Sequence, residues 1–314
     1  MRASVPASLT ARMTTPGSRR QLFAALVVQG AVVLVTVPLY GLVGLSIPSK
    51  SIGAQLVFPG FFGFAALLTA RDRNGIPQAL AALTVLLMAF PSIGAAQYLA
   101  AAWSRPLVDD HLLAADAALG IHQAALVAWT NAHTYIRSGL AVAYKSLLPQ
   151  FLLPVVVLGF LDHRELWRYV RCFQCIAILT IIMFGLWPAG VPALHGIPEV
   201  ISQGEAMAQF FALRAGTMTT LRLEVGQGII SFPSFHAAGA LIVTWALRRT
   251  WFFWPVAALN AALLASTVLL GLHYVIDVIA AVGVCAVVIV VERAVRPWLE
   301  PSVSSHPSGP RATR

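Results

Sequence analysis

The sequence predicts an all-α fold, a polytopic membrane bundle of about eight transmembrane helices. Charged residues make up only 11% and hydrophobic residues 58% of the 314 residues, whereas about a quarter of an ordinary soluble domain is charged. The mean hydropathy of +0.79 also excludes a soluble protein. A spanning helix needs about 20 mainly apolar residues, and eight stretches qualify: 21–47, 52–70, 78–100, 138–161, 172–188, 231–248, 253–271 and 273–292.

The first three stretches form an N-terminal transmembrane unit, residues 21–100. The segment before it, 1–20, is expected to be cytoplasmic because it holds four arginines: Arg2, Arg12, Arg19 and Arg20. The first apolar run reaches about Ile47, which is longer than the roughly 7–15 residues of a signal-peptide core. It therefore predicts a retained transmembrane helix.

Residues 101–296 are expected to form the membrane domain that contains the chemistry, and the last six helices of the whole bundle are expected to form the catalytic core. The semi-polar segment 104–137 predicts an interfacial helix, whose apolar face would consist of Leu112, Leu113, Leu119, Ala125, Leu126 and Trp129. Arg105, Asp109 and Asp110 are interpreted as a surface salt-bridge cluster. The tail, 297–314, is rich in Ser, Pro and Arg and predicts a disordered cytoplasmic segment.

The basic residues lie between the apolar stretches and favour one topology. With a cytoplasmic N-terminus, 15 of the 21 basic residues fall on the inner side, as the positive-inside rule requires. Both termini are then cytoplasmic. The net charge of +9 is not concentrated in a stripe with interleaved aromatic residues, so the lipid bilayer, and no nucleic acid, is the expected partner.

Two short motifs carry candidate chemistry, and the first is His273-Tyr-Val-Ile-Asp277. Positions four residues apart share one face of a helix, so Asp277 can hydrogen-bond one ring nitrogen of His273. The other nitrogen is then left to attack or to accept a proton. An aspartate within an apolar segment is costly and usually functional.

The second motif, Ser231-Phe-Pro-Ser-Phe-His236, opens the sixth apolar stretch. Helix N-termini offer unpaired N–H groups and a positive dipole end, which suit a phosphoryl group. Judged alone, Ser234 is equally a helix N-cap and His236 an interfacial side chain. One intervening helix separates the motifs, so both histidines reach the same membrane face, the extracytoplasmic one in this topology. One can attack phosphorus while the other protonates the departing oxygen. His236, His273 and Asp277 could also form a metal triad, but the phosphate-type helix entry and the cation-rich outer loop favour metal-free chemistry, and no cofactor is expected.

Together the motifs resemble those of the type 2 phosphatidic acid phosphatase superfamily, whose members carry Pro-Ser-x-His and, one helix pair later, His-x3-Asp. Phe235 in place of a glycine favours the branch similar to inositol phosphorylceramide synthase, an inositolphosphotransferase. Segments 103–120 and 143–150 look like bacterial relatives of that branch, which implies a bacterial inner membrane. The resemblance implies a phosphohistidine on His273, orientation by Asp277, general acid action by His236 and phosphate binding by Ser234.

Two departures from the family pattern leave the phosphate-binding cation unassigned. Ser266 and Thr267 occupy the positions of the family's Ser-Arg pair, and the Lys-x6-Arg-Pro motif has no match. A phosphoryl transition state needs cationic partners. The candidates are Arg214, followed by Lys145 and Arg222.

We therefore expect an integral membrane enzyme that hydrolyses or transfers the phosphate-containing headgroup of a lipid. The lipid, and the choice between water and an alcohol as acceptor, stay open. One alternative is a catalytically degenerate member that only binds lipid phosphate. Another is a proton-coupled transporter in which Lys145 and Asp277 relay protons.

Overall fold

The computed structural model describes residues 16–70, 75–198, 203–223 and 228–299. Over these residues the regular structure is helical, apart from an isolated parallel bridge between Ser46 and Thr220, which confirms the all-α prediction. Of the predicted terminal segments, 1–15 and 300–314 lie outside the described residues. The first helix begins at Pro16 and the last continues to Leu299.

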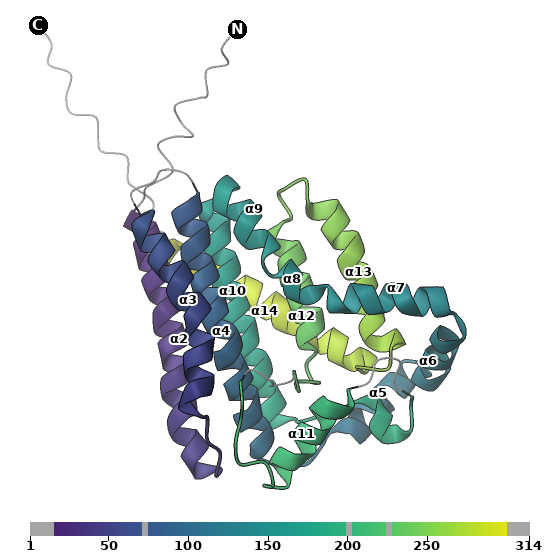
Figure 1. The fold of residues 1–314 in the computed structure, drawn as a ribbon. Coiled ribbons are helices and arrows are strands. Elements are labelled where there is room, and N and C mark those ends of the chain that lie inside the picture. Colours follow the sequence, from purple (N-terminus) through teal and green to yellow (C-terminus); the bar gives the residue numbers. More distant parts are fainter. Residues whose placement is uncertain (1–15, 71–74, 199–202, 224–227, 300–314) are drawn as a thin grey trace, which may run out of the picture.

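Four long helices form a sheaf: α2 (Pro16–Leu42), α3 (Ser49–Leu68), α4 (Ile76–Ala102) and α10 (His163–Leu186). They run side by side in Figure 1, and α4 contacts the other three. Gly75 precedes α4 where it crosses a neighbouring segment, and a Cβ there would lie 1.9 Å from the carbonyl oxygen of Gly159. Only glycine fits this crossing.

Between α4 and α10 the chain makes an angular excursion rather than the single interfacial helix expected over 104–137. It consists of α5 (Asp109–Ala118), α6 (Gln123–Ala132), α7 (Thr134–Lys145), α8 (Leu147–Gln150) and α9 (Leu153–Leu161). α5 and α6 meet at 83°, because Gly120 ends α5 with a left-handed φ of 73°. The expected apolar face is therefore split, with Leu112 buried and Trp129 exposed.

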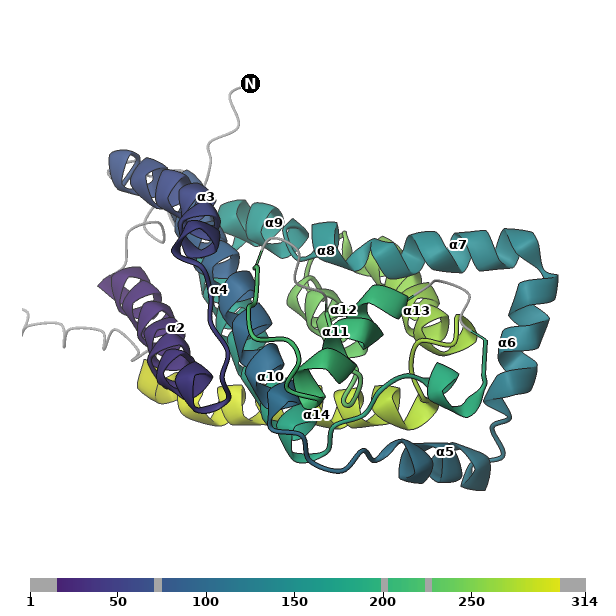
Figure 2. The same cartoon turned by 60° about the horizontal axis from the view of Figure 1, so that its bottom comes forward.

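The remaining helices are η1 (Pro192–His195), α11 (Gly204–Arg214), α12 (Phe235–Ala246), α13 (Phe253–Leu269) and α14 (Val275–Leu299). In Figure 2, α10, α14, α5, α6 and α7 frame α12 and α13, with α11 in front of α12. α12 contacts α8, α9, α10, α13 and α14. It is the central helix around which the second half of the chain packs.

Five helices, α2, α3, α4, α10 and α14, are long and apolar enough to cross a membrane, and two bent helix pairs raise the number to seven. The protein is therefore an integral membrane protein. All eight predicted stretches carry helix, but the fourth is bent by 41° after Lys145. α13 has 17 residues. α12 has only 12 residues, because residues 231–234 form a turn before it rather than its first turn.

A buried cluster of charged side chains ties α10 and α14 to the connection after α12. Glu165 and Glu292 are each only 5% exposed. Glu165 pairs with Arg168, Arg248 and Arg249, and Glu292 pairs with Arg168 and Arg171. Removing one partner of a buried pair leaves an uncompensated charge and costs about 3–5 kcal/mol.

We expect Glu292→Gln to lower the apparent melting temperature of the detergent-solubilised protein by roughly 5–15 °C. The reason is that Arg168 and Arg171 lose their shared carboxylate. The matched control is Glu205→Gln, at an exposed position of α11. Equal melting temperatures for the two variants would contradict a stabilising role for this cluster.

Candidate active site

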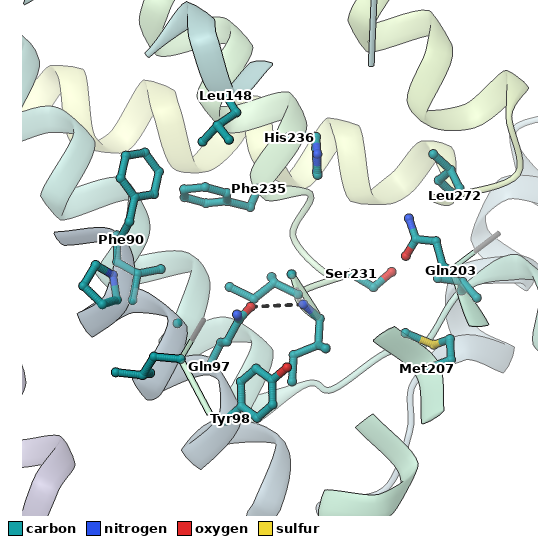
Figure 3. Close-up of a pocket in the computed structure, with 18 of the residues that line it drawn as sticks. Phe90, Gln97, Tyr98, Leu148, Gln203, Met207, Ser231, Phe235, His236 and Leu272 are labelled. Carbon is teal, nitrogen blue, oxygen red and sulfur yellow. Dashed lines mark hydrogen bonds between the residues drawn. The ribbon is translucent and has the colours of Figure 1, made fainter. Parts of the chain in front are cut away.

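A cavity of about 410 Å³ lies between α4, α12 and the segment that leads into α12. His236 and His273, which are 37 residues apart, both line it, so the two motifs share one cavity. Figure 3 shows two kinds of side chain in the same cavity as His236. The apolar ones include Phe90, Leu148 and Phe235. The polar ones include Gln97, Tyr98, Gln203 and Ser231.

His273 lies in the loop between α13 and α14, where its ring is held through one nitrogen. Nδ1 is 3.1 Å from the carbonyl oxygen of Ser231 and 3.3 Å from Oδ2 of Asp277. Both oxygens are acceptors, so Nδ1 carries the proton and Nε2 keeps its lone pair. With its proton on Nδ1, the ring presents the lone pair of Nε2, which is available as a nucleophile.

Asp277 is fully buried in the first turn of α14. Its Oδ2 also accepts the N–H of Tyr274 at 2.9 Å, so the carboxylate fixes the backbone of the loop as well as the ring. The expected contact with His273 is therefore present. It joins a loop residue to a helix residue rather than two positions on one helix face, because α14 begins two residues after His273.

His236 lies in the first turn of α12 and stacks on Tyr144 of α7, with ring centroids 4.2 Å apart and planes inclined by 15°. The Tyr144 hydroxyl is 3.3 Å from Nδ1 of His236 and accepts a hydrogen bond from Nε2 of Gln203 at 3.4 Å. A hydroxyl can donate or accept, so it serves Nδ1 whether or not the ring is charged. Nε2 of His236 is left for a ligand.

The two imidazoles face the same space, with ring centroids 6.1 Å apart and planes inclined by 53°. Each ring is held at Nδ1 by protein groups, so both Nε2 atoms are available to a molecule in the cavity. A nucleophile and a proton donor on either side of one group can divide a displacement reaction between them.

Ser234 is the N-cap of α12. Its Oγ accepts the N–H of Ala237 at 3.2 Å, and its own N–H donates to the carbonyl oxygen of Asp277 at 3.2 Å. The N–H groups of Phe235 and His236 precede the first intrahelical hydrogen bond, and both residues line the cavity. Ser234 thus lies at the helix entry, as expected for either a cap or a phosphate-binding residue.

Arg214 and Lys145 are not among the described residues that line the cavity. Arg214 ends α11, where its Nη2 donates to the carbonyl oxygen of Arg105 at 2.7 Å and its guanidinium lies 5.3 Å from the centre of the Phe210 ring. Lys145 ends α7 with an exposed side chain. The structure brings His273, His236 and Asp277 together, and Ser234 beside them, but not these two cations.

Two side chains from the excursion hold the His273 loop, and the sequence motifs did not include them. Asp116 of α5 accepts the N–H groups of Val275 and Ile276 at 2.8 and 2.9 Å. Nε2 of Gln123 in α6 donates to the carbonyl oxygen of His273 at 2.6 Å. A carboxylate at the start of α14 also meets the positive end of the helix dipole.

Asp109 also contacts the loop that contains His273. The prediction that it belongs to a surface salt-bridge cluster with Arg105 was therefore wrong. It is only 4% exposed, and its Oδ1 accepts the Tyr274 hydroxyl at 3.3 Å and the N–H of Gly190 at 3.1 Å. His195 lies 2.9 Å from the Tyr274 hydroxyl through Nδ1 and 2.9 Å from Asp110 through Nε2. Asp109 therefore pairs with Tyr274 and Gly190, and Asp110 pairs with His195, rather than either with Arg105.

The lining of the cavity limits what it can bind. Among the described lining residues there is no Lys or Arg. No group of three or more His, Cys, Asp or Glu side chains in the described part of the chain is placed to hold a metal ion. The polar lining consists of histidine, amide, phenol and serine groups.

The chain was compared with protein families, curated proteins and solved structures. A family model described as the PAP2 superfamily matches residues 110–291, which is more than half of the 314 residues. The comparisons with curated proteins and with solved structures gave no match. The matched range runs from α5 to α14 and contains both histidine motifs.

We expect Asp116→Ala to loosen the His273 loop, because two buried N–H groups lose their acceptor at a cost of about 1–3 kcal/mol each. Hydrogen exchange followed by mass spectrometry should show faster exchange over 271–277. His111→Ala is the control, since His111 lies at an exposed position of the same helix. Unchanged exchange in Asp116→Ala would rule out this role.

Proposed function

The chain belongs to the PAP2 superfamily, and on that premise we propose that it is a lipid phosphatase or phosphotransferase that works through a phosphohistidine on His273. Membership of the superfamily supports a phosphatase-type function on a lipid phosphate. One observation carries the proposal for the site. The rings of His273 and His236 share a cavity, and each is held by its Nδ1.

In the first proposed step, the lone pair on Nε2 of His273 attacks phosphorus. The bond between phosphorus and the leaving oxygen breaks, and that oxygen takes the Nε2 proton of His236, which acts as an imidazolium. Binding of an anionic phosphate favours this charged form. His273 then carries the phosphoryl group on Nε2 and a positive charge, which the Asp277 carboxylate at Nδ1 stabilises.

In the second step, the neutral His236 takes the proton of a water molecule or an alcohol. The oxygen of that acceptor attacks phosphorus, and the bond between phosphorus and Nε2 of His273 breaks. Both histidines return to their starting states. The Tyr144 hydroxyl can accept from Nδ1 of His236 in both states, because the Nδ1 proton stays on the ring while Nε2 loses and regains its own.

The phosphoryl oxygens need donors as negative charge moves onto them. We assign this task to the N–H groups that begin α12, at the positive end of the helix dipole. Ser234, which does not line the cavity in its described part, would act beside them by capping that helix start. Arg214 and Lys145 remain candidates on sequence grounds alone, because neither lines the cavity in its described part.

The composition of the cavity favours transfer to a neutral, hydroxyl-bearing acceptor over binding of a second anion. Gln97, Gln203, Tyr98 and Tyr144 supply amide and phenol groups, which match hydroxyl groups as donors and acceptors. This supports the proposal that the chain is similar to the inositolphosphotransferase branch. Phe90, Leu148 and Phe235 offer an apolar contact for the lipid part of the substrate.

We also propose that the site faces away from the cytoplasm. His236 lies at the first turn of α12, whereas Arg248 and Arg249 follow its last residue and pair with Glu165. The arginine-rich end of the helix is the one that the positive-inside rule places in the cytoplasm. With this orientation both termini are cytoplasmic. The membrane that we propose is the bacterial inner membrane.

The first test is trapping of the intermediate. His273→Ala should lose at least about 10⁴-fold in turnover of lipid phosphates, because the two-step route disappears. Acid quenching with a ³²P-labelled lipid phosphate should leave label on the unaltered protein and none on the variant. The control is His111→Ala, at an exposed position of α5. Binding of lipid phosphate without turnover by the unaltered protein would instead identify a degenerate, binding-only member.

The second test separates the roles of the histidines. His236→Ala should lose about 10²–10⁴-fold with an alkyl phosphate but much less with an activated aryl phosphate, whose leaving oxygen needs no proton. Tyr144→Phe should show the same dependence on the leaving group with a smaller loss, because it removes the partner of Nδ1. Tyr135→Phe, 94% exposed on the same helix, is the control. Equal losses on both substrates would exclude His236 as the acid.

A further inference from the structure

A second concave site lies on the outer surface of the sheaf, between α2, α4 and α10. It has a volume of about 640 Å³. Each helix contributes residues at helical spacing. They are Val28, Ala31, Val32, Val35 and Thr36 from α2, Ala96, Leu99, Ala100 and Trp103 from α4 and its C-cap, and Ile178, Ile181, Ile182, Gly185 and Leu186 from α10. We call this the sheaf groove. Small residues such as Ala31, Ala100 and Gly185 leave the hollow between the three helices.

The sheaf groove is separate from the cavity of the two histidines. α4 lines both, but with different residues: Phe90, Gly94 and Gln97 among those on the cavity, and Ala96, Leu99 and Ala100 on the groove. The helix therefore forms a wall between the two spaces. A molecule in the groove is not a molecule in the candidate active site.

One end of the groove carries the cation Arg105 and the exposed ring of Trp103. The loop that holds them is fixed to α11 from both sides. Oγ of Ser104 donates to the carbonyl oxygen of Arg214 at 2.9 Å, and Nη2 of Arg214 donates to the carbonyl oxygen of Arg105 at 2.7 Å. The positive charge is thus attached to a fixed backbone at the mouth of an apolar hollow. No carboxylate is among the described residues that line it.

The dimensions of the groove fit one half of a bilayer. From Val28 to Thr36 it follows nine residues of α2, and the eight rises between them span about 12 Å at 1.5 Å per residue. The hydrocarbon of one leaflet is about 15 Å deep. Tryptophan and arginine are the side chains that interact with lipid headgroups at the edge of that layer.

We propose that the sheaf groove binds an anionic phospholipid of the leaflet on the α11 side, with an acyl chain between α2, α4 and α10 and its phosphate on Arg105. The apolar lining takes the chain, and the guanidinium pairs with two phosphate oxygens. The site does not depend on the chemistry proposed for the histidines. It is a second lipid site on the protein, selective for headgroup charge.

The test uses the full-length protein in phosphatidylcholine nanodiscs that contain a small fraction of phosphatidylglycerol with a diazirine on one acyl chain. After irradiation, labelled peptides are identified by mass spectrometry. We expect labelling concentrated on 28–36 and 178–186, and stronger than with a diazirine phosphatidylcholine. Arg105→Gln should reduce it about fivefold. Lys50→Gln, an exposed lysine at the start of α3 and outside the groove, should leave it unchanged.

A second pair of variants tests the hollow itself. Ala31→Phe should fill the groove and remove the label from 178–186, whereas Val33→Phe, 41% exposed on the same helix but outside the groove, should retain it. The proposal is overturned if labelling spreads evenly over the lipid-facing helices. Equal labelling by the two lipids, or equal losses in Arg105→Gln and Lys50→Gln, would also overturn it.

Discussion

Inside a bilayer, every backbone N–H and C=O group must find its partner within the protein, because hydrocarbon offers none. This constraint falls hardest on α12 and α14, which begin inside the bundle. Ser234 caps α12, its N–H donates to the carbonyl oxygen of Asp277, and Asp116 accepts the first N–H groups of α14. The candidate catalytic histidines are placed at these two helix starts. Their positions therefore follow from the hydrogen bonds that allow the helices to begin there.

The two ends of the domain satisfy their buried charges in different ways. At one end, Glu165 and Glu292 pair with arginines and tie helices together. At the other, Asp109, Asp116 and Asp277 bind N–H and hydroxyl groups. These carboxylates fix the backbone of the His273 loop and the hydroxyl of Tyr274. The ion pairs at the first end hold helices together, and the carboxylates at the second end hold the loop that contains His273.

The sequence predicted the helical membrane class and the meeting of His236, His273 and Asp277, since apolar length and helix spacing are local properties. It did not predict that Asp116 and Gln123 hold the His273 loop, because those contacts join residues 150 or more positions apart. Asp109 and Asp116 in the semi-polar segment 104–137 were the available signal. Arg214 was expected in the cavity from its place in the outer loop. The turn after α4 instead offers its guanidinium a backbone carbonyl, which no local pattern reveals.

The shortness of α12 has a consequence for the membrane itself. In the orientation proposed above, Arg248 and Arg249 mark one boundary of the bilayer, and the 12 residues of α12 cover about 18 Å of its roughly 30 Å hydrocarbon thickness. His236 therefore lies about 12 Å below the opposite boundary. Either the lipid descends into the protein or the bilayer thins around α12 to meet it. Bilayer thickness then becomes a determinant of access, because each added ångström of hydrocarbon lengthens the path between a headgroup at the surface and the two imidazoles.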